Sequence, residues 1–262
     1  MTGLIDTHLQ LDFPEFDPDR DAVVARAQAA GVSALITIGT DLEGTRRALE
    51  LTRRYPQVYA AGGIHPHEAG KAVSEDIPEI ARILAEKKFV AVGEVGLDFY
   101  RDETPRAVQE AVFVRFLAVQ QEVAKPLVIH CREAFERTEE LLRAHRTPPW
   151  EGVMHCFTGT AEHMKRFLDL GFYISFAGMI TYPRSNALRE ACRTCPAGRL
   201  LLETDAPYLA PQSVRGKRNE PAFVLETARE VARVRGVEFE TLAAETTANA
   251  CRLFRIPEGG LQ

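Results

Sequence analysis

Eight short apolar runs recur along the chain, and longer amphipathic stretches separate them. Runs of this length and composition are typical of strands buried on both faces of a parallel sheet. Between them, apolar residues lie three or four positions apart, as on one face of a helix, most clearly at Val108, Val112, Phe116, Val119 and Val123. The predicted strands are Gly3–Asp6, Ala34–Gly39, Val58–Ile64, Phe89–Glu94, Leu127–His130, Gly152–Cys156, Phe172–Ala177 and Leu200–Asp205.

The alternation of strands and helices predicts an α/β fold with a parallel sheet. Eight such units in 262 residues, 45% of them hydrophobic, fit one (β/α)8 TIM barrel, with an open doubly wound sheet as the alternative. No GxGxxG or GxxxxGK[ST] motif follows the first run, which weighs against a nucleotide-binding sheet. We therefore predict a single barrel domain over residues 1–262. Expected helix boundaries are N-caps at Asp41 and Ser74 and C-terminal caps at Gly31 and Gly171.

The bulk properties limit the partners and the location. The formal net charge is −5, so phosphate binding would need a local basic patch. Neither a leader nor an apolar stretch of membrane-spanning length is evident, which predicts a cytoplasmic protein without membrane contact. We also expect a monomer with a loose tail at Arg255–Gln262. An odd number of cysteines, five, indicates reduced thiols. Cys192 and Cys195 form a CxxC without a second pair, which predicts a turn between a helix and a strand rather than a zinc site.

The stretch Phe89–Tyr100 places an acidic residue at the end of a buried strand. Glu94 lies between Gly93 and Gly96, and Asp98 follows as a second acid. A carboxylate in such a place is costly unless positive charge compensates it. A metal ion or a basic partner is therefore implied, although an acid at a strand end paired with an arginine would explain this stretch equally well.

Five of the seven histidines lie at or just after the end of a predicted strand: His8, His65, His67, His130 and His155. The other two, His145 and His163, lie in helical stretches, where packing or solvation explains them.

In a barrel, the C-terminal ends of the strands converge on one face. Imidazoles and carboxylates gathered there would repel or stay unpaired without a cation, so a metal site is predicted. Nitrogen and oxygen ligands suit zinc, manganese or iron, and the carboxylates would also accept magnesium. The residues expected to meet are His8, Glu94, His130, His155 and Asp205.

Several of these stretches together resemble one family. The chain is similar to the TatD-type metal-dependent hydrolases, within the amidohydrolase-like barrels, and the resemblance runs from the first predicted strand to beyond the eighth. The matching pieces are Ile5–Asp12, Gly63–His67, Gly93–Arg101, Val128–Glu133, Gly152–Gly159, Leu201–Leu209 and Arg215–Pro221.

The resemblance implies two divalent metal ions, Mg²⁺, Mn²⁺ or Zn²⁺, bridged by Glu94. It implies that His8 and Asp205 hold one ion and that His130 and His155 hold the other. A water activated by the metals would attack phosphorus, with Asp205 orienting or deprotonating it. Two cations stabilise the attacking and leaving oxygens of such a displacement.

Two further residues enter through the same resemblance. His65 matches a histidine near the substrate, with phosphate contact or protonation of the leaving group as its expected role; a loop histidine stacked on Pro66 is the alternative. The family pattern at the first strand is HxH, but Gln10 occupies the second position and faces the site beside His8. An amide oxygen is a weaker ligand than imidazole, so we expect the first metal position to bind its ion weakly, as magnesium or manganese, and to exchange it while the second ion is retained.

The implied activity is a metal-dependent deoxyribonuclease, a 3′-5′ exonuclease that prefers single-stranded DNA or frayed ends. Local positive charge supports a phosphate contact, although a solvated or salt-bridged loop would explain the basic residues equally well. Aromatic residues near strand ends could stack on unpaired bases or simply pack. The basic candidates are Arg101, Arg132, Arg215, Lys217 and Arg218. The aromatic candidates are Tyr100, Phe157, Tyr182 and Tyr208.

Three alternatives stay open. The same ligands would serve a deacylase of mischarged or D-aminoacyl-tRNA. A small-molecule amidohydrolase is a second possibility, but strand four supplies Glu94 where many such barrels have a modified lysine. The third is a metal-binding module without catalysis, against which Asp205 argues as a base candidate beside the metal.

Overall fold

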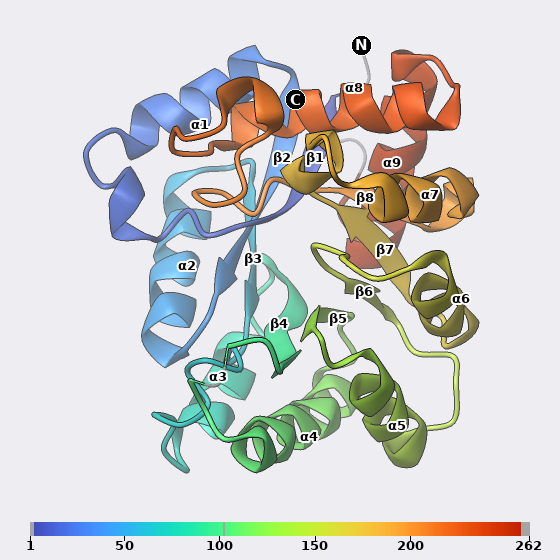
Figure 1. Cartoon of the computed structure of the whole chain (residues 1–262). Coiled ribbons are helices and arrows are strands. Elements are labelled where there is room, and N and C mark those ends of the chain that lie inside the picture. Colours follow the sequence, from blue (N-terminus) through green and yellow to red (C-terminus); the bar gives the residue numbers. More distant parts are fainter. Residues whose placement is uncertain (1–2, 102, 258–262) are drawn as a thin grey trace.

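Eight parallel strands form one sheet in the order of the sequence in the computed structural model, which describes residues 3–101 and 103–257. Figure 1 shows the strands as a central ring, with helices around the outside in chain order. The strands are β1 (Leu4–Leu9), β2 (Val32–Gly39), β3 (Val58–Gly62), β4 (Phe89–Asp98), β5 (Leu127–Arg132), β6 (Gly152–Met154), β7 (Tyr173–Phe176) and β8 (Leu200–Leu202). The helices are α1 (Arg20–Ala29), α2 (Leu42–Arg54), α3 (Asp76–Ile83), α4 (Arg106–Val123), α5 (Phe135–His145), α6 (Ala161–Asp169), α7 (Asn186–Thr194), α8 (Val224–Arg235) and α9 (Phe239–Phe254).

The first and last strands meet and close the ring. Leu9 forms a parallel bridge with Ala206, and the Thr7 hydroxyl donates a hydrogen bond to the carbonyl oxygen of Leu202 at 2.9 Å. Just beyond β8, the backbone N–H of Asp205 donates to the carbonyl oxygen of His8 at 2.9 Å. The predicted (β/α)8 barrel is therefore confirmed, and the open doubly wound alternative is excluded.

The barrel has an inner and an outer apolar layer. Each strand contributes at least one side chain to an inner cluster that includes Ile5, Ala34, Val128, Val153 and Leu201. The end of α9 joins this cluster through Leu253, Phe254 and Ile256. Because most inner residues lie near the beginnings of their strands, α9 packs against the N-terminal end of the barrel, and the opposite end is left for polar side chains.

Several boundary predictions are confirmed and others are wrong. Asp41 caps α2 by accepting a hydrogen bond from the backbone N–H of Gly44 at 2.6 Å. Gly31 and Gly171 follow α1 and α6 with positive φ, as expected of C-terminal caps. Ser74 is not an N-cap, because α3 begins at Asp76 with Glu75 before it.

The buried face of α4 matches the predicted one in part, because Phe116 and Val119 are buried as expected. Val108 is exposed, and Val112 and Val123 are only half-buried. The helix buries Phe113, Phe116 and Leu117 among others, so the larger aromatic side chains occupy the interface with the barrel.

The CxxC lies where it was predicted. Cys192 is in the last turn of α7 and Cys195 follows it, before β8, and both are free thiols. Both side chains are buried, and burial raises the pKa of each thiol to about 12. Across the part of the chain that the structure describes, no helix is long and apolar enough to cross a membrane. The predicted loose tail lies outside the described residues from position 258 onwards.

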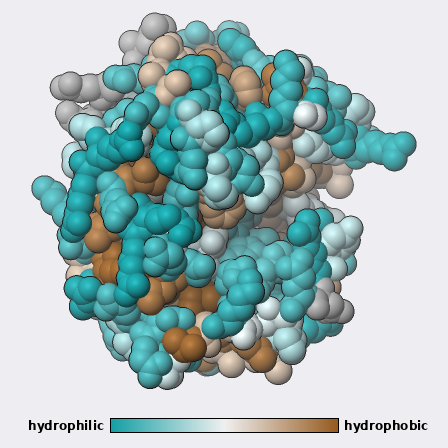
Figure 2. All heavy atoms as spheres, turned by 90° about the vertical axis from the view of Figure 1, so that its left-hand side faces the viewer, coloured by the Kyte–Doolittle hydropathy of each residue, from teal (hydrophilic) through white to brown (hydrophobic). Residues whose placement is uncertain are grey.

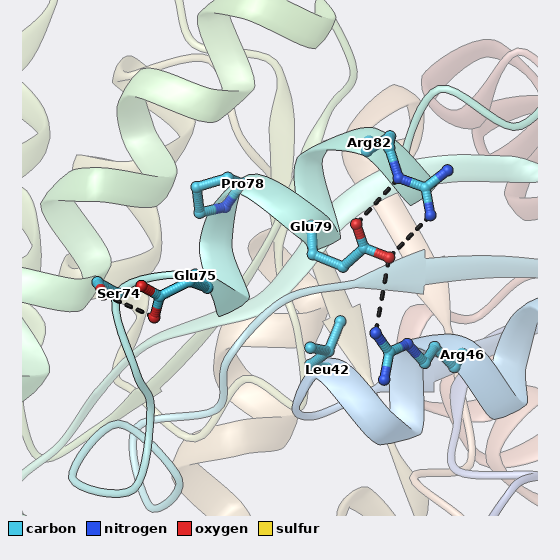
Figure 3. A pocket seen from close by; sticks show the side chains of 7 residues that line it. All are labelled: Leu42, Arg46, Ser74, Glu75, Pro78, Glu79 and Arg82. Carbon is cyan, nitrogen blue, oxygen red and sulfur yellow. Dashed lines mark hydrogen bonds and ion pairs between the residues drawn. The ribbon is translucent and has the colours of Figure 1, made fainter.

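The outer surface includes a depression between α2 and α3, well outside the ring of strands (Figure 3). Its two arginines are paired with one glutamate: Glu79 lies 3.6 Å from Arg46 and 2.8 Å from Arg82. Glu75 accepts a hydrogen bond from the hydroxyl of Ser74. The face that carries α1 and α2 is largely hydrophilic, with apolar side chains showing between the polar ones (Figure 2). None of the predicted site residues lines this depression.

A buried carboxyl group ties β1 to the segment after β8. Asp6 accepts hydrogen bonds from the hydroxyl of Thr204 at 2.5 Å and from its backbone N–H at 3.0 Å. Burial raises the pKa of Asp6 to about 8, although these hydrogen bonds oppose the shift. Between about pH 4 and pH 8 the folded chain therefore holds a proton that the unfolded chain releases.

The free energy of unfolding should accordingly fall as pH rises through this interval, by up to about 1.4 kcal/mol per pH unit from this group. Asp6→Asn should remove that part of the slope. Urea unfolding of the metal-free protein at pH 5, 6, 7 and 8 measures it, with the exposed Asp17→Asn as the control. Parallel pH slopes for the wild type and Asp6→Asn would contradict the prediction.

Candidate metal centre

Strand periodicity carries two histidines into the barrel mouth. Val128 and Val153 belong to the inner layer, and side chains two residues apart on a strand face the same side. His130 and His155 therefore point inward, one layer nearer the C-terminal end. The same step from Leu201 leads to Glu203, which is 1% exposed.

Glycines bring β4 unusually close to β5. Gly93 and Gly96 have φ of 145° and 142°, and a Cβ on Gly93 would lie 2.5 Å from the carbonyl oxygen of Val128. Only glycine fits these positions. The prediction that this strand ends at Glu94 is wrong: β4 continues to Asp98, because Gly96 still pairs with His130 in β5.

Glu94 is the centre of the site. Its Oε1 lies 2.7 Å from Nε2 of His155, 2.8 Å from Nδ1 of His130 and 3.5 Å from Nε2 of His65. Its Oε2 lies 3.3 Å from Nε2 of His8. Four imidazole rings thus surround one carboxylate that is 2% exposed.

The charges in this cluster shift one another's pKa values. Burial alone would raise the pKa of Glu94, but the rings of His155, His65 and His8 hold it well below its ordinary value. Burial would lower the pKa of His155, yet Glu94 and Glu203 raise it well above the ordinary value. The ionised carboxylate therefore requires positive charge at this place, which protons on the rings or a bound cation can supply.

Two groups of possible metal ligands lie in the described part of the chain: His8, His155 and Asp205, and His65, Glu94 and His130. Within each group the ligand atoms lie within 4.8 Å of one another. The grouping differs from the expected one, because His155 joins His8, whose ring it stacks on at 3.9 Å. Nε2 of His155 also lies 3.4 Å from Nδ1 of His130, so His155 stands between the two groups.

The backbone fixes the orientation of His65. The N–H of His67 donates to Nδ1 of His65 at 3.1 Å, so the hydrogen of a neutral ring lies on Nε2. Burial lowers the pKa of His65 well below its ordinary value, which favours that neutral ring. An Nε2–H is a donor and not a metal ligand, so His65 suits contact with a substrate better than coordination.

Gln10 lies beside His8, as predicted. Its Nε2 is 3.1 Å from Nε2 of His8 and donates to Oδ1 of Asp205 at 3.3 Å. Its Oε1 is buried and has no hydrogen-bond partner among the described residues. In this orientation the amide nitrogen, which does not bind cations, faces two candidate ligands, and an unpaired oxygen is available if the amide turns. The donor set fits a divalent cation, with Gln10 as its weakest member.

Two acidic residues, which were not among the residues expected to meet, also belong to this site. Oδ2 of Asp98 lies 2.9 Å from Nε2 of His67 and 3.1 Å from Nε2 of His130. Oε1 of Glu203 lies 3.3 Å from Nδ1 of His155. The available signal was the period of two along the strands: Glu203 precedes Asp205 by two residues, and Asp98 follows Gly96 by two.

The basic candidates have different environments. Arg218 is held by Asp19 through two hydrogen bonds of 2.7 and 2.9 Å, so the salt-bridged alternative describes it better than a phosphate clamp. Arg132 stacks on Tyr100 at 4.0 Å, and Arg215 stacks on Tyr182 at 4.5 Å. The side chains of Arg101 and Lys217 are exposed.

The aromatic candidates differ in how exposed their rings are. Stacking of Phe157 on a base is excluded, because its side chain is buried in the core. The Tyr182 hydroxyl donates to the carbonyl oxygen of Ala210 at 2.9 Å. Tyr100 and Tyr208 remain largely exposed and are free to meet a ligand on at least one side.

Comparison with known proteins decides the family. Residues 5–255 match the family model described as TatD related DNase. The chain belongs to this family. It is 40% identical to a Bacillus subtilis (strain 168) protein, YabD, named an uncharacterized metal-dependent hydrolase, over 97% of this chain and 99% of that protein. It is 39% identical to the 3′-5′ ssDNA/RNA exonuclease TatD of Klebsiella pneumoniae (strain 342), over 98% of this chain and 100% of that protein.

Solved structures agree with this assignment. The TatD homologue YJJV of Escherichia coli K12 superposes with a TM-score of 0.92 and 32% identity, over 97% of this chain and 98% of that one. The predicted family is confirmed. The predicted enzyme class, a metal-dependent hydrolase acting on ester bonds, is confirmed at the level of the TatD family.

Proposed function

We propose that this TatD-family protein is a deoxyribonuclease that removes nucleotides from the 3′ ends of single strands or frayed duplexes, using two divalent metal ions at the barrel mouth. The observation that carries the proposal is Glu94 surrounded by four imidazoles, with Asp205 in reach of the same cluster. Relatives named as 3′-5′ ssDNA/RNA exonucleases support the substrate class and the polarity.

The ligands would divide around Glu94. His8, Gln10 and Asp205 would hold one ion, and His130 and His155, which both lie against Oε1 of Glu94, would hold the other, with Glu94 between the two. When bound, such ions make hydroxide available near neutral pH and stabilise the charge that develops on a phosphodiester.

The remaining chemistry falls to the side chains. Burial raises the pKa of Asp205, while His8 and His155 oppose the shift. We propose that Asp205 accepts the proton of the attacking water. His65 would donate its Nε2 hydrogen toward the phosphate or the leaving oxygen.

The rim of the mouth would hold the strand. Arg132 and Arg101 lie at the end of β5 and just beyond β4, and Arg215 lies in the segment after β8, so positive charge would face the substrate despite the net charge of −5. Tyr100 and Tyr208 offer exposed rings on which unpaired bases could stack. The monomeric state and the cytoplasmic location stay predictions.

The test is hydrolysis by metal-stripped protein after addition of Mg²⁺, Mn²⁺ or Zn²⁺. A single strand labelled at its 5′ end should give a ladder of shortening products, and the same strand labelled at its 3′ end should release one labelled nucleotide at once. A blunt duplex of the same sequence should react more slowly. Absence of cleavage with all three metals would reject the proposal and direct the next assay to aminoacyl-tRNA, whose ester the same ligands could cleave.

The presence of Gln10 beside His8 leads to a separate prediction about metal content. The wild type should retain about one equivalent of metal after dialysis, and Gln10→His should retain close to two, because imidazole binds divalent transition metals more tightly than an amide oxygen. Elemental analysis of both proteins after identical dialysis against zinc-containing and then metal-free buffer measures this. Two tightly held equivalents in the wild type would contradict it.

A further inference from the structure

Asp98 is a buried carboxylate whose two oxygens have separate partners. Oδ1 accepts hydrogen bonds from the backbone N–H groups of Tyr100 at 3.0 Å and Arg101 at 2.9 Å. Oδ2 faces the Nε2 atoms of His67 and His130. Gln109 holds the backbone of Asp98 on both sides, accepting from its N–H at 2.8 Å and donating to its carbonyl oxygen at 3.1 Å. The carboxylate therefore has one orientation.

This orientation determines which nitrogen of His130 carries hydrogen. An ionised carboxylate only accepts hydrogen bonds, so Oδ2 of Asp98 requires an N–H at Nε2 of His130. The lone pair then lies on Nδ1, which points into the mouth, 2.8 Å from Oε1 of Glu94. A histidine that binds a metal through one nitrogen commonly donates its other N–H to a carboxylate.

We propose that Asp98 is a positioning residue that fixes the hydrogen of His130 on Nε2 and so presents Nδ1 to a divalent cation, with His67 as the second donor to the same oxygen. The inference rests on the part of the proposed function that makes His130 a metal ligand. It does not depend on which substrate the enzyme cleaves.

Glu203 provides a matched comparison, because it serves His155 in a different way. A single oxygen, Oε1, accepts from the backbone N–H of Cys156 at 2.7 Å and lies 3.3 Å from Nδ1 of His155. One oxygen thus satisfies both the backbone and the ring. An amide in this position would keep that oxygen and could serve both partners.

The isosteric amide variants should therefore behave differently. In Asp98→Asn, the N–H groups of Tyr100 and Arg101 would hold the amide oxygen, so the NH₂ group would face His130. That group donates and does not accept, so the ring would have to carry its hydrogen on Nδ1, toward the cation. In Glu203→Gln, His155 can keep its hydrogen on Nδ1 and its lone pair on Nε2.

The experiment measures Zn²⁺ affinity of the metal-stripped wild type, Asp98→Asn and Glu203→Gln by competition with a chromophoric chelator. Asp98→Asn should bind Zn²⁺ about 10- to 100-fold more weakly, the usual loss when such a supporting partner is removed. Glu203→Gln, which keeps an acceptor for Nδ1 of His155, should lose clearly less affinity than Asp98→Asn, and the exposed Glu190→Gln in α7 should bind Zn²⁺ as the wild type does. Circular dichroism and thermal unfolding show whether each variant is folded.

Nitrogen-15 NMR of the zinc-loaded wild type gives a readout that needs no variant. The ring of His130 should show a protonated Nε2 and a metal-bound Nδ1. A hydrogen on Nδ1 would overturn the proposal, and so would equal zinc affinities for the wild type and Asp98→Asn. The zinc measurements use no nucleic acid. If Asp98→Asn binds Zn²⁺ more weakly than the wild type but the wild type does not cleave DNA, the proposed nuclease activity is rejected and this inference stands. A wild type that binds no Zn²⁺ would overturn both.

Discussion

Glu94→Gln should lower metal-dependent hydrolysis by at least about a thousandfold, the scale of loss when an essential group of a catalytic unit is removed. The amide keeps the volume of a side chain that is 2% exposed, so the barrel should still fold. It loses the negative charge that balances the surrounding rings, and its NH₂ group would face at least one candidate ligand. Both metal content and kcat/KM should fall together, as measured by elemental analysis and by release of nucleotides.

A glutamate on the outer surface supplies the control for this variant. Glu190 in α7 is exposed and paired with Arg193, and Glu190→Gln should change neither metal content nor rate. Hydrolysis that persists in Glu94→Gln at the wild-type rate would show that the activity comes from another protein or another site.

Asp205→Asn should separate catalysis from metal binding. We expect kcat to fall by about 10² to 10⁴, the range for loss of a general base, with at least one equivalent of metal retained. The backbone of Asp205 has φ of 58°, a conformation that asparagine adopts readily, so the turn after β8 should persist. Metal should be retained because His130 and Glu94 can hold an ion without the side chain of Asp205.

Kinetics and metal analysis on one Asp205→Asn preparation test the assignment. A fall in kcat with little change in KM indicates a role in the chemical step. Loss of all metal would make Asp205 primarily a ligand and reject its role as base. Unchanged cellular function of the variant would favour the metal-binding module without catalysis.

The barrel itself was predictable because alternation is a local signal. Eight apolar runs and the helical stretches between them identify the elements, and parallel strands bring their C-terminal ends to one face whatever the details of packing. His8, Glu94, His130, His155 and Asp205 all lie at or near such ends, so their meeting followed from the topology. The period of two then sets which side chains point inward.

The pairing inside the mouth was decided by the tertiary structure. Close approach of the β4 glycines to β5 extends β4 to Asp98 and makes this second acid a partner of His130, a contact that the expected strand end at Glu94 did not predict. Stacking of His155 on His8 brings His155 next to His8 as well as to His130, so that it stands between the two groups of candidate ligands. Both depend on the stagger and twist of neighbouring strands, which the apolar pattern of a single strand does not contain.

The same division holds at the rim. The sequence placed Arg218 and Phe157 near strand ends. In the structure, Arg218 pairs with Asp19, which precedes α1, and Phe157 is buried in the outer core. The sequence by itself determined the barrel, the face that carries the site and most of its polar groups, because these follow from local periodicity and parallel topology. Only the tertiary structure decided which group meets which, because a charged or aromatic side chain takes its partner from whatever distant segment the fold brings within reach.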